Sequence, residues 1–172
     1  IGQFIVPYGV AIDPTSHNIA VTDYSVRRVQ IFNSAGTYQS QFGTSGTGDG
    51  QFAFPAGIAI DPISRNIVVA DSGNNRVQIF SSAGAYLSQF GTGGAGNGQF
   101  SQPYAVAIDP TSQKIVVTDG NNRRVQIFSS AGVYLSQFGS LGSGNGQFNT
   151  PFGVAIDPAS HNIIVSDFGS NR

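Results

Sequence analysis

Apolar and polar positions follow the same order along this chain once every 48 residues. In the repeat that begins at Asn97, apolar runs of four or five residues alternate with turns rich in Gly, Pro, Asn and Ser. Short runs of β-branched and aromatic residues between turn residues predict β-strands. We expect four strands in this repeat, at Ala105–Asp109, Ile115–Asp119, Arg124–Phe128 and Tyr134–Phe138. No segment keeps a helical apolar period for long enough to predict a helix.

The polarity of these strands changes from the first to the fourth. In the second repeat, the run Ile67–Ala70 is apolar throughout, so both of its faces need cover. The third strand alternates around Val77 and Ile79, and the fourth, Tyr86–Phe90, is partly polar. A sheet that lies between two copies of itself, with its last strand at the rim, produces this gradient, and such a sheet is a propeller blade. A sandwich would leave one wet face on every strand.

The segment Pro55–Phe80 contains P-A-G-I-A-I-D-P and, further on, N-I-V-V-A-D-S-G-N-N-R-V-Q-I-F. This segment resembles an NHL repeat, and the likeness covers essentially the whole chain in four registers. The NHL family forms β-propellers, usually of six blades. The resemblance implies an all-β propeller of NHL type with four-stranded antiparallel blades, but no activity, because one fold hosts many functions.

The chain is expected to form one propeller segment over residues 1–172. Its repeats are approximately 1–48, 49–96, 97–144 and an incomplete 145–172. Three blades and half of a fourth do not close a ring, and uncovered sheet edges and faces associate. We therefore expect either further copies of the chain or the remainder of a longer chain to complete the ring.

Two Asp positions recur in every repeat. The first ends the second strand, and an Arg follows five residues later at the start of the third strand. Across the four-residue loop the two side chains can form a charge-assisted hydrogen bond. A fold needs the same pair in every blade, whereas a binding site rarely does, so we interpret these pairs as structural staples. The staples are Asp23 with Arg28, Asp71 with Arg76, Asp119 with Arg124, and Asp167 with Arg172.

The second Asp position precedes Pro in the motif Asp-Pro-x-Ser, which is turn chemistry, because the carboxylate accepts backbone N–H groups and Pro fixes φ. Its four copies are Asp13, Asp61, Asp109 and Asp157. Copies in one shared environment do not supply the two carboxylates of different environment that acid–base catalysis uses.

One turn position holds His17, Arg65, Gln113 and His161 in the four repeats. A position that accepts three such residue types indicates a solvated turn. Some NHL-like amidating lyases bind zinc through His, but a zinc site takes three or four ligands and this chain has two His. Calcium at Asp49 would need more oxygen ligands than its Gly and Asn neighbours supply. We expect no metal and no cofactor.

Composition and charge argue against phosphate binding, nucleic-acid binding and a membrane span. The Gly-rich segments Gly43–Gly50, Gly91–Gly98 and Gly139–Gly146 lack the Gly-Lys-Ser/Thr ending and the helix of a phosphate-binding loop. The net charge is −1, there is no Glu and no Cys, and four of the seven Arg belong to staples. This argues against a nucleic-acid face. No apolar run is long enough for a membrane span.

Three repeat positions differ between copies, and strand direction places them on one face of the propeller. Aromatic residues, Arg and Asn gather there, and this composition suits recognition of a protein or a glycan. The expected binding residues are Tyr8, Tyr24, Arg27, Asn75, Tyr104, Arg123, Phe152 and Phe168.

The sequence therefore predicts a non-catalytic binding scaffold with a protein or glycan ligand, within a larger secreted or cell-surface propeller protein. Abundant small polar residues, no Cys and the single Lys114 suit an extracellular location. Two alternatives stay open. One is a self-assembling repeat protein whose open blade edges associate. The other is a fragment of a propeller enzyme of lyase or lactonase type, which would need His or Glu along its channel.

Overall fold

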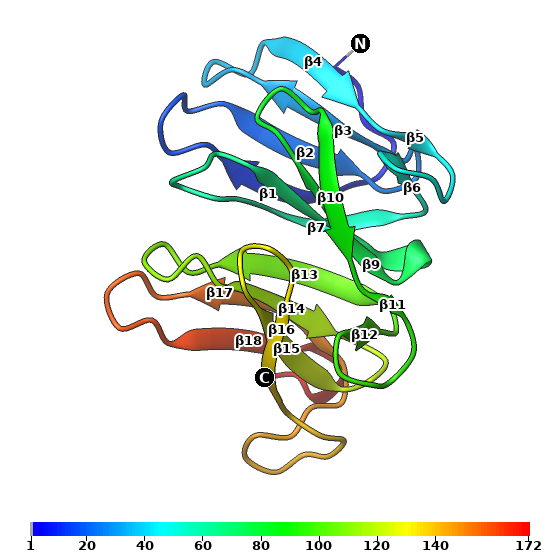
Figure 1. Ribbon diagram of the computed structural model, residues 1–172, viewed down its shortest axis with the longest axis vertical. Coiled ribbons are helices and arrows are strands. Elements are labelled where there is room, and N and C mark those ends of the chain that lie inside the picture. Colours follow the sequence, from blue (N-terminus) through cyan, green and yellow to red (C-terminus); the bar gives the residue numbers. More distant parts are fainter. Residues whose placement is uncertain (1) are drawn as a thin grey trace.

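The computed structural model describes residues 2–172 as a row of antiparallel sheets that follow one another in chain order, from the blue to the red end of Figure 1. We call them blades 1 to 4. Blade 1 contains β1 (Pro7–Ile12), β2 (Ile19–Asp23), β3 (Arg28–Phe32) and β4 (Tyr38–Phe42). Blade 2 contains β7 (Pro55–Ile60), β8 (Ile67–Asp71), β9 (Arg76–Phe80) and β10 (Tyr86–Phe90). Blade 3 contains β13 (Pro103–Ile108), β14 (Ile115–Asp119), β15 (Arg124–Phe128) and β16 (Tyr134–Phe138). Blade 4 contains β17 (Pro151–Ile156) and β18 (Ile163–Asp167).

This architecture confirms the expected partial ring of four-stranded antiparallel blades. In blade 3, the second, third and fourth strands have the predicted bounds. The first strand begins two residues earlier than predicted, because Pro103 pairs with Asp119 ahead of a bulge. The Thr118 hydroxyl accepts the Ala105 N–H in that bulge at 2.9 Å and so satisfies a donor that the irregular ladder leaves free.

The Gly-rich loops contain more structure than the sequence predicted. Within each loop two short segments pair in parallel. In the last loop this pairing is a single bridge between Leu141 and Phe148. In the other two loops the pairs are β5 (Thr44–Ser45) with β6 (Gln51–Phe52), and β11 (Thr92–Gly93) with β12 (Gln99–Phe100). Each pair places one fully buried Phe in the core, Phe52 from β6 and Phe100 from β12.

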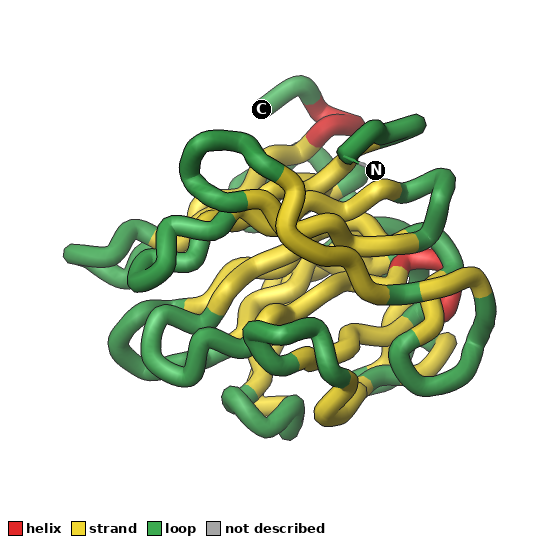
Figure 2. The backbone as a smooth tube through the Cα atoms, turned by 90° about the horizontal axis from the view of Figure 1, so that it is seen from above, coloured by secondary structure: helices red, strands yellow, loops and turns green. Residues whose placement is uncertain are grey.

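Two single-turn 3₁₀ helices, η1 (Ser72–Asn74) and η2 (Phe168–Ser170), lie between second and third strand positions, where a loop was expected (Figure 2). Among residues 2–172, no helix is long and apolar enough to cross a bilayer.

The first strands form the inner wall of the ring. β1 packs on β7, β7 on β13, and β13 on β17, around a channel cavity of about 230 Å³. Glycine permits this approach: a Cβ added to Gly9 would lie 2.6 Å from the Ala56 carbonyl oxygen. One added to Gly57 would lie 2.6 Å from the Ala105 Cα. The blades therefore meet backbone to backbone at the channel.

Two buried clusters form the core, one in each seam between complete blades. In the first, Ala20 and Ile31 of blade 1 pack against Ile58, Val69 and Phe80 of blade 2. The second cluster repeats these positions one blade later, with Val68, Ile79, Val106, Val117 and Phe128 among its members. Both faces of blade 2 are thus covered, and every residue of β8 is buried, whereas three residues of the rim strand β10 are exposed.

Candidate binding face

The Asp71 carboxylate is fully buried at the end of β8 and accepts hydrogen bonds from four groups. These are the Arg76 Nε (2.9 Å), the Asn74 side-chain amide (2.8 Å), the Gln78 side-chain amide (3.1 Å) and the Ala53 N–H (2.8 Å). Burial raises the pKa of the Asp71 carboxyl, and the hydrogen bonds from Asn74, Ala53 and Arg76 act in the opposite direction. This enclosure identifies the carboxylate as part of the blade itself.

The same network holds the Gly-rich loop. The terminal nitrogens of Arg76 donate to the carbonyls of Thr47, Gly48 and Gln51, each at 2.8 Å. Gln78, whose repeat position is Gln in all three complete blades, also donates to the Gln51 carbonyl at 2.7 Å. Sequence reasoning missed this buried Gln, although its recurrence in every third strand was the available signal.

All four predicted staples bring their two side chains together. The N···O distances are 2.9 Å for Asp71–Arg76 and 2.8 Å for Asp119–Arg124, and they lengthen to 3.4 Å for Asp23–Arg28 and 3.7 Å for Asp167–Arg172. The staples of the two inner blades are therefore the tighter ones.

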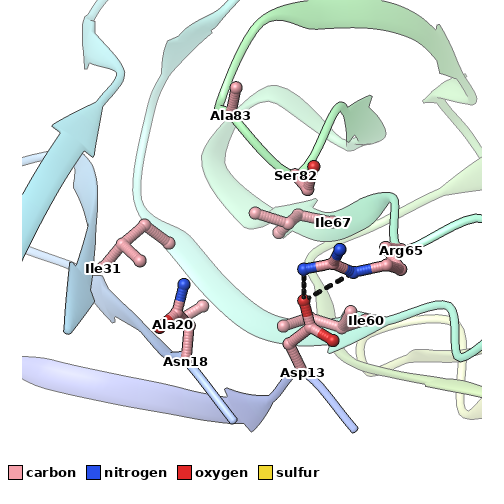
Figure 3. Close-up of a pocket in the computed structure, with 9 residues that line it drawn as sticks. All are labelled: Asp13, Asn18, Ala20, Ile31, Ile60, Arg65, Ile67, Ser82 and Ala83. Carbon is pink, nitrogen blue, oxygen red and sulfur yellow. Dashed lines mark hydrogen bonds and ion pairs between the residues drawn. The ribbon is translucent and has the colours of Figure 1, made fainter. Parts of the chain in front are cut away.

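The turn that contains His17 in blade 1 was predicted to be solvated, and in the later blades the side chain at this position is half-buried or exposed but also makes a contact that was not predicted. There the equivalent side chain reaches back to the Asp-Pro turn of the preceding blade. Arg65 Nε lies 2.9 Å from an Asp13 carboxylate oxygen, Gln113 Nε2 lies 3.3 Å from Asp61, and His161 Nδ1 lies 3.0 Å from Asp109 (Figure 3 for the first pair). We call these three pairs the inter-blade latches.

The latch donors share a left-handed backbone, with φ of 62° at Arg65, 55° at Gln113 and 59° at His161. The first latch lines a cavity of about 140 Å³ between blades 1 and 2 (Figure 3). Cavities recur beside the other two latches. A hollow that recurs at each seam is a feature of blade packing, and we do not assign a ligand to it.

The latch carboxylates are also turn acceptors, as Asp-Pro-x-Ser predicted. Asp13 accepts the Thr15 N–H at 2.9 Å and the Ser16 hydroxyl at 2.8 Å. Burial raises the pKa of Asp13, but the hydrogen bonds from Arg65, Thr15 and Ser16 outweigh it and hold that pKa well below its usual range. The Ser112 N–H and the charge of His161 likewise lower the pKa of Asp109.

Six aromatic rings form a continuous cluster at the mouth of the channel, and we call it the aromatic face. Centroid distances along it are 4.9 Å for Phe54–Tyr24, 5.4 Å for Tyr24–Tyr8, 5.8 Å for Tyr8–Phe152, 5.0 Å for Phe152–Tyr104 and 6.0 Å for Phe152–Phe168. Tyr8 and Phe54 are each 37% exposed and Phe168 is 75% exposed. All four blades contribute a ring, so the cluster also joins blade 1 to blade 4 across the channel mouth.

Six of the eight expected binding residues meet at this face: Tyr8, Tyr24, Arg27, Tyr104, Phe152 and Phe168. Arg27 joins it through Phe54, because its guanidinium carbon lies 4.9 Å from the centre of that ring. Phe54 was missed because the other repeats hold Val, Gln and Thr at its position.

The side chains of the two remaining residues, Asn75 and Arg123, bond to backbone groups. The Asn75 side-chain oxygen accepts the Gln102 N–H at 2.8 Å, and Arg123 donates to the Asn121 carbonyl at 3.0 Å. Both residues have left-handed backbones, with φ of 54° and 55°.

Two tyrosine hydroxyls of the aromatic face, those of Tyr8 and Tyr104, have a raised pKa and remain proton donors. Burial, together with the neighbouring Tyr104 and Tyr24, raises the pKa of Tyr8 far above its usual value. Burial and Tyr24 likewise raise the pKa of Tyr104, whose hydroxyl donates to the Gln102 side-chain oxygen at 3.0 Å. Gly120 makes room for the Tyr104 ring, because a Cβ at that position would collide with it.

The face can offer flat apolar surface, phenolic donors and one guanidinium. Among residues 2–172, no group of three or more His, Cys, Asp or Glu side chains is placed to hold a metal ion.

Two protein-family models match parts of this chain. The family model described as NHL repeat matches residues 52–80, and the model described as 6-bladed beta-propeller matches residues 107–172. The chain belongs to the NHL-repeat β-propeller family. The staple Asp71–Arg76 and the buried Gln78 of this NHL propeller segment lie within the first match.

Solved structures of low sequence identity share the fold of the NHL propeller segment. A chain of Kuenenia stuttgartiensis Hydrazine Synthase aligns with a TM-score of 0.74 at 11% identity, over 98% of this chain and 44% of that one. A chain of a Nidogen/Laminin Complex aligns with a TM-score of 0.75 at 20% identity, over 95% of this chain and 57% of that one. The segment thus spans about half the length of these chains, and the likeness shows the fold alone. A search of curated protein sequences gives no match.

Proposed function

We propose that this NHL propeller segment is a non-catalytic interaction module that binds a protein ligand through its aromatic face. The observation that carries the proposal is the continuous cluster of six rings at the channel mouth, exposed at Tyr8, Phe54 and Phe168 and flanked by Arg27. Tyr and Arg are common among the residues that dominate binding energy where proteins meet, and Phe is enriched at such interfaces.

The blade scaffold holds the face rigidly. The rings pack on one another, and Tyr24 and Phe168 directly follow the buried staple carboxylates Asp23 and Asp167. Little side-chain freedom is then left to lose on binding, which favours affinity. The low net charge suits a ligand that is recognised by apolar contact and hydrogen bonds, with weak dependence on salt.

The comparisons support this proposal only at the level of the fold. One similar chain comes from a complex of nidogen with laminin, and another from hydrazine synthase, so related architectures occur in a protein complex and in an enzyme. The non-catalytic part of the proposal predicts that the purified chain holds no metal ion. Elemental analysis of the purified chain tests this part, and a stoichiometric bound metal would contradict it.

We also propose a secreted or cell-surface location for the protein. The support is compositional, since Gly, Ser, Thr, Asn and Gln are abundant and the chain has no Cys and a single Lys. Fractionation of the source cells tests the location, and recovery in the cytosol alone would contradict it.

Selection of a displayed random-peptide library on the immobilised chain tests the binding site. Tyr8→Ala and Phe152→Ala should each reduce the affinity of selected peptides by about tenfold or more. Phe138→Ala on the rim strand β16 is the matched control, because Phe138 is 37% exposed, as Tyr8 is. Equal loss in all three variants, or binding only on a glycan array, would overturn the proposal of a protein ligand at this face.

A further inference from the structure

The Gly-rich loop that leads into blade 3 contains an Asn-Gly pair, Asn97 and Gly98, and Asn97 is exposed. The two residues form the centre of a turn, because the Gln99 N–H donates to the Gly96 carbonyl at 3.1 Å. Gly98 has a left-handed backbone with φ of 75°, which glycine adopts without strain. Asn followed by Gly is the pair most prone to deamidation, because glycine has no side chain to shield its backbone nitrogen. The loop therefore places two potential reactants next to each other.

The reaction needs only these two residues and water. The backbone nitrogen of Gly98 attacks the side-chain carbonyl carbon of Asn97 and forms a C–N bond. The bond from that carbon to the side-chain nitrogen breaks, and the nitrogen leaves as ammonia with the former amide proton of Gly98. Water then opens the cyclic imide at either of its carbonyl carbons. The products are aspartate and isoaspartate, and in isoaspartate the backbone runs through the former side chain.

The Gly98 nitrogen is held by a buried side chain. Its N–H donates to the side-chain oxygen of Gln126 at 2.9 Å, and Gln126 is fully buried. Gln126 is itself fixed, because its amide nitrogen donates to the Gln99 carbonyl at 2.7 Å and to the Asp119 carboxylate at 3.1 Å. A nitrogen whose proton is directed at a fixed acceptor is not free to attack Asn97. The reaction therefore requires this hydrogen bond to open first.

Blade 2 shows that the loop accommodates an aspartate. Asp49 stands at the repeat position of Asn97, and the Gly50 N–H donates to the Gln78 side-chain oxygen at 3.0 Å. The turn in this loop is closed at the same distance as in blade 3, 3.1 Å. Conversion of Asn97 to aspartate therefore gives blade 3 a loop of the kind that blade 2 already has.

Isoaspartate has a different effect, because it adds a methylene group to the backbone of the loop. The Arg124 side chain donates to three carbonyls of this loop, each at 2.8 Å, and they belong to Ala95, Gly96 and Gln99. The added group lies between the second and the third of these acceptors. Isoaspartate therefore disturbs the network of the Asp119–Arg124 staple.

We propose that Asn97 is a site of spontaneous deamidation and that Gln126 sets its rate by holding the Gly98 nitrogen. In the folded chain the reaction proceeds only while the loop is open, so it is slow. Release of the loop from Gln126 makes it fast. This inference is independent of the aromatic face and its ligand.

Peptide mapping of the incubated chain tests the proposal. Trypsin cleaves after Arg76 and Lys114, which yields a peptide with Asn97 as its only Asn, whereas Asn145 lies in a different peptide. The mass change from amide to carboxyl measures the conversion, and enzymatic methylation of isoaspartate identifies that product. Asn97 in the chain unfolded by guanidinium chloride should convert about tenfold faster than in the folded chain, or more.

A pair of matched variants tests the role of Gln126. Gln126→Leu should raise the rate at Asn97 several-fold in the folded chain, because the Gly98 N–H loses its acceptor. Gln78→Leu makes the same change beside Gly50 in blade 2 and should leave the rate at Asn97 unchanged. An equal increase in both variants would mean that loss of stability controls the reaction, and it would overturn the proposal. So would an unchanged rate in Gln126→Leu.

The wild-type chain provides a second test if Gln126→Leu does not fold. Equal conversion of Asn97 in the folded and the unfolded chain would show that the Gln126 hydrogen bond gives no protection. Asn97→Asp should keep the urea midpoint of the wild type, because the equivalent loop of blade 2 contains Asp. A lower midpoint would contradict the expected fit of the aspartate product.

Discussion

The two sets of Asp residues in this propeller lie at opposite ends of the sheets and stabilise different levels of the structure. A staple such as Asp71–Arg76 works inside one blade, and its carboxylate is enclosed by four donors. A latch such as Asp13–Arg65 works between blades, near the surface, and joins residues 52 positions apart. The staple donor is Arg in all four blades, whereas the latch donor is Arg, Gln or His. The comparison indicates that a donor position tolerates fewer types of side chain when its carboxylate partner is more deeply buried and has more hydrogen-bond donors.

The largest expected effect comes from breaking a staple. Asp71→Ala leaves the buried Arg76 charge without its carboxylate, and we expect it to lower the free energy of unfolding by about 3–5 kcal/mol. Urea denaturation measures the change. Asp119→Ala should cost a similar amount, because its network has the same four donors. A loss as small as that of a latch variant would show that the two Asp sets are equivalent.

The next effect concerns the buried Gln of the staple. Gln78→Leu keeps the volume of the side chain but leaves the Gly50 N–H without its acceptor and the Gln51 carbonyl with one donor fewer. We expect a loss of about 1–3 kcal/mol for each buried group left unpaired. Hydrogen exchange should place the loosened amides in the Gly-rich loop around Gly50. Unchanged exchange there would mean that Gln78 does not hold the loop.

A latch variant should cost much less. Arg65→Gln introduces the donor that blade 3 already uses, and the Arg65 side chain is 37% exposed, so we expect a loss of at most about 1 kcal/mol. The matched variant Arg76→Gln, which makes the same chemical change in a staple, should cost several times more. Equal urea midpoints for the two variants would remove the distinction between staple and latch.

The smallest effect is the pH dependence of the latch. The folded-state pKa of Asp13 lies below its unfolded value of about 3.9, so ionised Asp13 stabilises the fold above that pH. This contribution is lost as the pH falls through the lower, folded-state pKa. The stability difference between wild type and Arg65→Gln should therefore stay level from about pH 7 to about pH 4 and shrink as the pH falls further, toward the folded-state pKa of Asp13. A difference that stays constant would mean that Arg65 does not act through the Asp13 charge.

Local chemistry made most of the fold predictable. The second, third and fourth strands of blade 3 were placed to the residue, because the strand-ending Asp119 and the strand-starting Arg124 mark their corners. The early start at Pro103 was missed, since it depends on pairing across a bulge and on the Thr118 hydroxyl. The fold-back of the Gly-rich loops was missed too, because it depends on Arg76 and Gln78 donors more than twenty residues downstream.

The candidate site was partly predictable for the same reason. Residues that differ between repeats indicated the aromatic face, and six of the eight expected residues meet there. Phe54 has no aromatic counterpart in the other repeats and gave no signal. The latches were hidden because Arg65, Gln113 and His161 look interchangeable along the chain. What they share, a nitrogen donor aimed at the preceding blade, appears only when the blades are packed together.

The constant acceptor and variable donor of the latch also make the blades modular. Every repeat carries an Asp-Pro carboxylate on one side and a turn donor on the other, so any of these blades can be joined to any other without changing the acceptor. Duplicating, deleting or exchanging a whole repeat therefore preserves each junction. A protein built in this way can gain or lose a blade while each new junction keeps this acceptor and a turn residue opposite it.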